Sequence, residues 1–109
     1  MELVALYKCL GDSTRLRIAH LLLQGEPLCV RQIQESIQES QVKTSKHLAY
    51  MKKRGLAAVE RKANWNFYRI AEDLDPVASE SLAALGDYAD PKMTSDLKRL
   101  KALRSEECC

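Results

Sequence analysis

Apolar residues recur at intervals of three and four along the first half of the chain. This spacing places them on one face of an α-helix, which has about 3.6 residues per turn. The pattern predicts four helices, over 2–10, 13–24, 30–38 and 40–55. Asp12 and Ser40 stand at two of the starts, where a side-chain oxygen can accept a hydrogen bond from an unpaired backbone N–H. Gly55 suits the left-handed backbone that often ends a helix.

The pattern changes after Gly55. Residues 57–62 and 66–70 are two short β-prone runs, and 63–65 lie between them as a turn. They predict a hairpin with a basic, aromatic tip. A single hairpin is marginally stable in water, so we expect this one to pack on the helices.

The last third of the chain returns to helical spacing. An aspartate-proline pair opens the first of its helices, because proline suits the first helical position. Helices are predicted over 75–85 and 93–103, with a break over 86–91. We therefore expect one domain over 1–104 and a flexible, cysteine-containing tail over 105–109.

The third and fourth predicted helices are joined by a short polar turn, which is the order of a helix-turn-helix. On the fourth, Lys43 and Lys46 share one face while Leu48 and Met51 share another. The whole chain has a net charge of +2, yet residues 41–70 hold eight lysines and arginines against one acid. That stretch is therefore +7 and the remainder is −5. Charge alone would favour a solvated helix face, but the turn before it and the hairpin after it favour a polyanion-binding surface.

The predicted fold class is mainly α with one β-hairpin, a winged helix-turn-helix. Such a basic helix fits the major groove, where side chains read base edges and cations neutralise phosphates. The candidate DNA contacts are Gln41, Lys43, Thr44, Ser45, Lys46, His47 and Tyr50 on the helix, and Arg61, Lys62 and Asn64 on the hairpin. Trp65 suits either a DNA contact or packing of the turn. Arg15 and Arg17 suit a phosphate, a carboxylate or solvent.

Three stretches together resemble the ArsR/SmtB-type metalloregulatory repressors. They are 11–18, similar to the start of that family's second helix, 40–56, similar to its recognition helix, and 61–69, similar to its wing. The resemblance covers the chain to about Ile70. It implies a non-enzymatic homodimer, held by the first and last helices, that represses transcription from a two-fold operator. It further implies release from the double-stranded operator DNA when a metal or metalloid binds.

The cysteines Cys9, Cys29, Cys108 and Cys109 are the candidate inducer ligands. Cys29 matches the first position of the Cys-Val-Cys found in arsenic-responsive members, but Arg31 stands at the second. The zinc-type site of the family needs histidines on the late helices, which carry none. Soft thiolates select thiophilic ions. We therefore expect trivalent arsenic or antimony on Cys29, Cys108 and Cys109, with Cys9 as an alternative ligand, while an organoarsenical would need only the adjacent pair.

Other interpretations of the cysteines stay open. Their oxidation would make the chain a redox or thiol-reactive sensor of the same fold. A thiol enzyme or a metal-handling chaperone is a different class, but no cysteine–histidine–acid set can be placed in a cleft. We expect no permanent cofactor. No apolar run approaches a membrane span, and the start of the chain lacks the build of a signal peptide, so we expect a cytoplasmic protein without a membrane partner.

Overall fold

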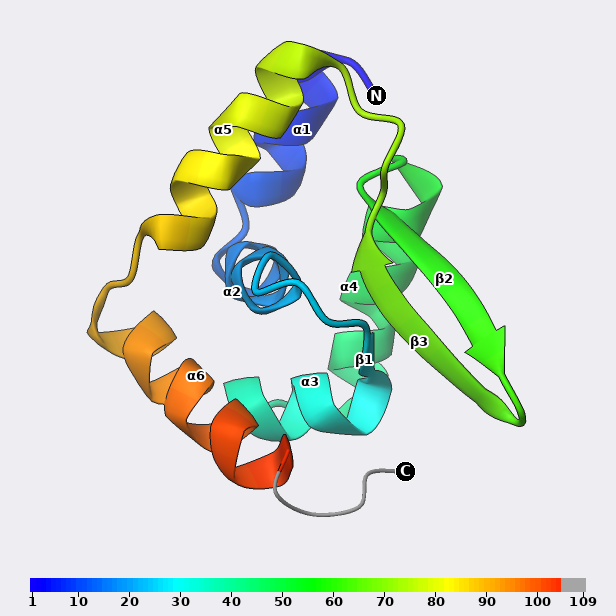
Figure 1. The fold of residues 1–109 in the computed structure, drawn as a ribbon, viewed down its shortest axis with the longest axis vertical. Coiled ribbons are helices and arrows are strands. Elements are labelled where there is room, and N and C mark those ends of the chain that lie inside the picture. Colours follow the sequence, from blue (N-terminus) through cyan, green and yellow to red (C-terminus); the bar gives the residue numbers. More distant parts are fainter. Residues whose placement is uncertain (105–109) are drawn as a thin grey trace.

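The computed structural model describes residues 1–104, so the predicted tail lies outside the described residues. Six helices and three strands form within the described part (Figure 1). In chain order they are α1 Leu3–Leu10, α2 Ser13–Leu22, β1 Leu28–Cys29, α3 Val30–Ile37, α4 Gln41–Lys53, β2 Ala57–Lys62, β3 Trp65–Ile70, α5 Pro76–Asp87 and α6 Pro91–Arg104. The predicted fold class, mainly α with a β-hairpin, is confirmed.

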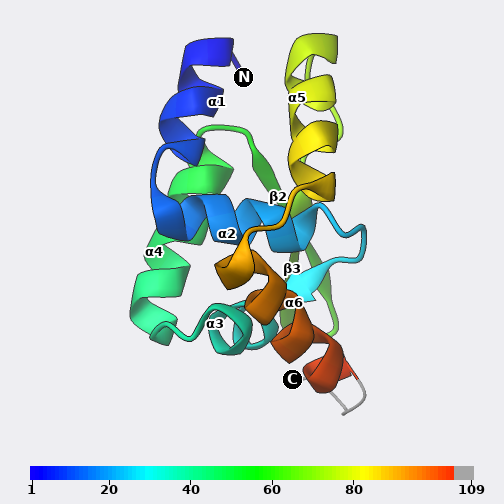
Figure 2. The same ribbon diagram turned by 90° about the vertical axis from the view of Figure 1, so that its left-hand side faces the viewer.

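Helix α2 runs through the middle of the molecule and contacts all five other helices (Figure 1). Its Ile18 and Leu21 are fully buried, and they join Leu6 of α1 and Leu48 of α4 in one apolar core. Helices α1 and α5 lie side by side at one end of the molecule, and α3 and α6 pack together at the other (Figure 2). The helix-turn-helix is thus anchored to a central helix.

The sheet has one more strand than the sequence pattern indicated. No strand was predicted between the second and third helices, but Leu28 and Cys29 pair antiparallel with Tyr68 and Phe67. The strand order is β1-β3-β2, so the hairpin is tied directly to the start of α3. Two residues are too few to show a strand pattern, and their pairing depends on the tertiary arrangement.

The hairpin itself forms as predicted, with a shorter turn. Trp65 pairs with Lys62 at the end of the ladder, so the turn consists of Ala63 and Asn64 alone. Ala63 has a φ of 54°, a left-handed conformation that is uncommon for a residue with a Cβ.

Capping residues set the boundaries of the helices around α4, the second helix of the helix-turn-helix. The carboxylate of Asp12 accepts hydrogen bonds from the N–H groups of Thr14 and Arg15, and the hydroxyl of Ser40 accepts one from Lys43. Gly55 has a φ of 89°, as expected. The predicted break over 86–91 is wrong at its start, because α5 continues to Asp87. One glycine near a helix end can be tolerated without stopping the helix.

A buried ion cluster fastens α6 to the helix-turn-helix. Asp96 is 1% exposed, and its carboxylate accepts hydrogen bonds from Arg17 at 2.7 and 2.9 Å and from Arg99 at 2.9 Å. Arg17 also donates to the carbonyl of Ile37 at 2.8 Å, and Arg99 donates to that of Ser36 at 2.6 Å. These carbonyls lie at the end of α3, so the cluster holds the turn that leads into α4.

Candidate nucleic-acid interface

Helix α4 has one buried face and one exposed face. Leu48 and Met51 are fully buried. Lys43 and Lys46 are exposed on the other side, and Gln41 is exposed in the first turn. Lys43 Nζ lies 3.2 Å from Glu39 Oε2. This ion pair spans one helical turn, with the lysine side chain 51% exposed, so it contributes little and leaves the ammonium available to a phosphate.

The expectation that Thr44 contacts DNA is wrong. Its exposed fraction is 0%, and its Oγ1 has no hydrogen-bond partner in the described part of the chain. Helical periodicity explains the error, because Thr44 lies four residues before Leu48 and shares its inward face. Ser45 is partly exposed one position further on.

His47 and Tyr50 are partly buried and contact the start of α2. Arg15 links them, since its Nη1 lies 3.4 Å from His47 Nδ1 and its guanidinium stacks 4.1 Å from the centre of the Tyr50 ring. Arg15 also donates through Nε to the carbonyl of Cys9 at 2.8 Å, so it joins the end of α1 to α4. These contacts hold α4 in place. DNA contacts from the two side chains stay a prediction.

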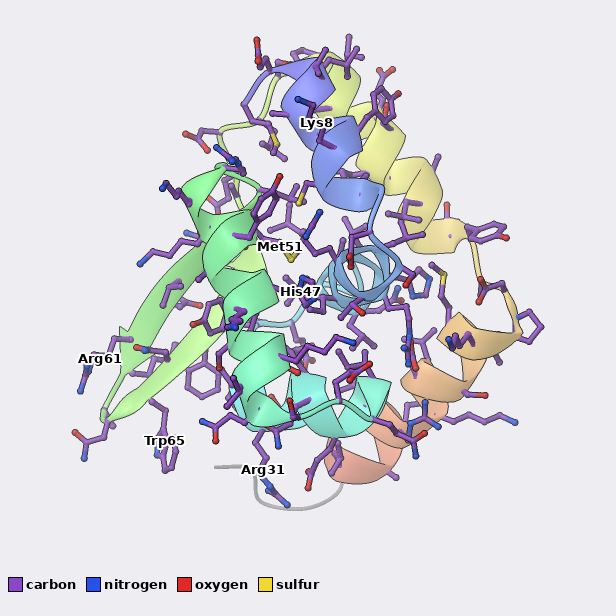
Figure 3. All side chains as sticks on the ribbon, turned by 180° about the vertical axis from the view of Figure 1, so that it is seen from behind. Lys8, Arg31, His47, Met51, Arg61 and Trp65 are labelled. Carbon is purple, nitrogen blue, oxygen red and sulfur yellow. The ribbon has the colours of Figure 1, made fainter. Side chains whose placement is uncertain are left out.

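The wing carries the remaining expected contacts. Arg61, Lys62 and Asn64 are all exposed at its tip. Figure 3 shows Arg61 and Trp65 projecting away from the protein body. Trp65 is 49% exposed, which leaves much of its ring accessible at the same tip as the cations. The sequence left a DNA contact and packing of the turn open for Trp65, and the exposure of its ring favours the DNA contact.

Val42 is an exposed residue of α4 that the sequence analysis did not include among the candidate DNA contacts. It is 68% exposed, in the first turn of α4 and next to Gln41 and Lys43. An apolar side chain on this face can contact the methyl group of thymine. The sequence could have shown this, because Val42 lies outside the row of residues that faces the core and so has no packing role there.

Two of the four cysteines lie in the described part of the chain. Cys9 is fully buried in the main core. Burial raises the pKa of its thiol, and the nearby Arg15 only partly opposes that effect. Cys29 is 2% exposed and precedes α3, where its N–H donates to Gln32 Oε1 at 3.0 Å. The described residues contain no group of three histidine, cysteine or acidic side chains that could hold a metal ion, and the predicted ligands Cys108 and Cys109 lie outside them.

Residues 12–59 match the model of the arsR family of bacterial regulatory proteins. Among curated proteins, the chain is 31% identical over 94 residues to the arsenic resistance transcriptional regulator ArsR1 of Pseudomonas putida. The aligned stretch covers 86% of this chain and 73% of that relative. It is 34% identical over 77 residues to the arsenical resistance operon repressor of Escherichia coli, covering 71% and 66% of the two chains.

Solved structures of transcriptional regulators share the fold. HlyU from Vibrio cholerae superposes with a TM-score of 0.66 at 27% identity, over 75% of this chain and 85% of that one. The antimony-specific transcriptional repressor AntR gives 0.62 at 26% identity, over 94% and 80%. The homodimeric winged helix-turn-helix domain Mb0332 from Mycobacterium bovis shares the fold, with a TM-score of 0.59 at 24% identity, over 97% and 85%. No helix in the described part is long and apolar enough to cross a membrane.

Proposed function

Because the chain belongs to the arsR family of bacterial regulatory proteins, we propose that it is a homodimeric repressor that trivalent arsenic or antimony releases from operator DNA. The observation that carries the DNA-binding part is the pair of exposed lysines, Lys43 and Lys46, on a helix whose opposite face is buried. The names of the arsenic-resistance relatives and of the antimony-specific structure support the choice of inducer.

The described contacts supply a rigid reader. Ser40 caps α4, its inner face is fixed in the core, and Arg15 ties it to the end of α1. Lys43 and Lys46 then neutralise phosphates, which gives affinity without sequence preference. Gln41 and Ser45 offer hydrogen-bonding groups to base edges, which gives sequence preference.

A second copy of the chain would complete the DNA-binding unit. Helix α1 leaves Val4 (61%) and Tyr7 (57%) exposed, and Val77 (57%) and Tyr88 (56%) are exposed at the start of α5 and just after its end. Neighbouring exposed apolar groups are typical of an interface between subunits. A two-fold dimer would present two α4 helices to half-sites one helical turn apart, or a multiple of it.

Cys29 fits the inducer by chemistry and by position. Trivalent arsenic bonds to cysteine sulfur: each As–S bond that forms replaces an As–OH bond, and the hydroxide leaves with the thiol proton as water. Cys29 directly precedes α3, the helix that supports the reader, so a ligand there would act on the helix-turn-helix. The adjacent Cys108 and Cys109 would supply the other sulfurs. Release requires that the inducer bind the DNA-incompetent state better than the DNA-bound state.

Arsenite titration of operator complexes formed by reduced protein tests this proposal. The pair Cys108→Ser/Cys109→Ser should bind operator normally and stay bound at arsenite concentrations that release the wild type. Cys29→Ser should show the same defect, and Cys9→Ser should respond nearly as the wild type does. A double tail variant that is released at wild-type concentrations would remove the tail from the mechanism. A normal Cys29→Ser with a defective Cys9→Ser would move the site to α1.

A redox or thiol-reactive sensor of the same fold is the alternative function, because it would use the same cysteines. Mass spectrometry separates the two after treatment with arsenite or with peroxide. A retained metalloid adduct that coincides with DNA release supports the proposal. Release that follows only disulfide formation, with no adduct after arsenite, supports the alternative.

A further inference from the structure

A cleft of about 670 Å³ lies between the wing and the helix-turn-helix. It is bounded by the first turns of α3 and α4 and by the tip of the β2–β3 hairpin. Its polar and aromatic lining includes four carboxamides, one cation, one carboxylate, one thiol and one indole: Gln34, Gln41, Asn64, Asn66, Arg31, Glu35, Cys29 and Trp65. Figure 3 shows Arg31 and Trp65 projecting from the same edge of the molecule, one from α3 and the other from the wing.

This lining has the chemistry of a surface for a sugar-phosphate strand. Four carboxamides offer N–H donors without bringing negative charge. Arg31 adds a guanidinium, whose planar fork of donors matches phosphate oxygens. Its Nε lies 3.4 Å from Glu35 Oε2, but the two side chains are 47% and 42% exposed. An ion pair that exposed contributes little, so the guanidinium can exchange the carboxylate for a phosphate.

The position of the cleft points to the same ligand. A reader helix in the major groove and a wing at the adjacent minor groove are separated by one strand of the DNA backbone. The cleft lies between the helix-turn-helix and the wing, with α3 supplying most of the helical side and Gln41 the first turn of α4. The elements on its two sides carry exposed cations, with Lys43 in the first turn of α4 and Arg61 and Lys62 on the wing.

We propose that this cleft seats the sugar-phosphate strand between the two grooves, with Arg31 on a phosphate and Trp65 against the sugars. This inference rests on the proposed DNA binding and assigns Arg31 a role in it.

Salt-dependent binding of Arg31→Ala tests the assignment. Binding to a random-sequence duplex and to operator would be followed by fluorescence anisotropy. Each lost phosphate contact lowers the slope of log K against log salt by about 0.9, so a dimer that loses two should lose about 1.8. Across a fourfold rise in salt, the Kd of the wild type should therefore increase about 12-fold more than that of the variant. Arg31→Lys should keep most of the slope, because the charge remains.

Two controls isolate the cleft. Lys98→Ala removes an exposed cation from α6, away from the cleft, and should leave the slope unchanged. Trp65 is the only tryptophan of the chain, so its emission should change when a saturating duplex binds the wild type. Circular dichroism of Arg31→Ala should match the wild type, since the side chain is half exposed.

The possible failures are distinguishable. A wild type that binds neither duplex would overturn the proposed function and this inference together. If the wild type binds and Arg31→Ala keeps the full slope, or if Trp65 emission is unmoved at saturation, the inference alone is wrong. An Arg31→Ala protein with an unchanged slope but altered arsenite release would place the inducer, and not DNA, in the cleft.

Discussion

Removing the carboxylate of Asp96 should destabilise the fold more than any change on the DNA-binding face. Asp96 is 1% exposed and the side chain of Arg17 is 10% exposed, so this is a buried pair. The hydrogen bonds that Arg17 donates to Asp96 raise the pKa of Arg17, which therefore stays charged. Asp96→Ala leaves a buried guanidinium without a counter-ion, which costs about 3–5 kcal/mol in comparable cases. That is a large part of the roughly 5–15 kcal/mol that stabilises a typical domain.

Urea unfolding at a fixed protein concentration measures this cost, because a dimer's apparent stability depends on concentration. A loss under about 1 kcal/mol for Asp96→Ala would refute the reasoning, since a buried unpaired charge costs several times that. The double variant Arg17→Met/Asp96→Leu is the matched control. It should recover part of the loss, because the buried charge is gone, but not all of it, because the Ile37 carbonyl loses its donor. Operator affinity of Asp96→Ala should also fall while the protein is still folded, since the cluster holds the end of α3.

The double variant Lys43→Ala/Lys46→Ala should bind operator and random DNA more weakly alike, and the slope of log K against log salt should fall by about one per lost contact. An unchanged slope in the anisotropy assay would contradict the assignment of α4. Backbone N–H groups, chiefly that of Arg15, donate hydrogen bonds to the carboxylate of Asp12 and lower its pKa from 3.8. The carboxylate therefore stabilises the fold fully above pH 3.8, and this stabilisation is lost as the pH falls through the lower pKa of the folded state. Asp12→Ala should cost about 1 kcal/mol at neutral pH, and urea midpoints measured between neutral and acid pH should converge with those of the wild type. Cys9 should react slowly with iodoacetamide in the native protein, because its thiol is buried and its pKa is raised, and fast modification at neutral pH without unfolding would contradict its placement.

Local chemistry was sufficient to predict most of the fold from the sequence. Asp12, Ser40 and Gly55 act within a turn of their own positions, so the starts of α2 and α4 and the end of α4 could be placed before any tertiary contact was known. The paired β-prone runs predicted the wing, since alternation and a short turn are local signals. The exposed Lys43 and Lys46 followed from helical periodicity, which also should have excluded Thr44.

Other features depended on residues far apart in the chain, and only the tertiary structure decided them. Strand β1 exists because Leu28 and Cys29 meet Tyr68 and Phe67, some forty positions later. Arg17 was equally suited to a phosphate or an acid until the fold brought Asp96 to it. The cleft between Arg31 and Trp65 likewise joins two segments that no local pattern connects. A sequence pattern reports what each segment can form by itself, whereas pairing partners and clefts arise from the arrangement of several segments in space.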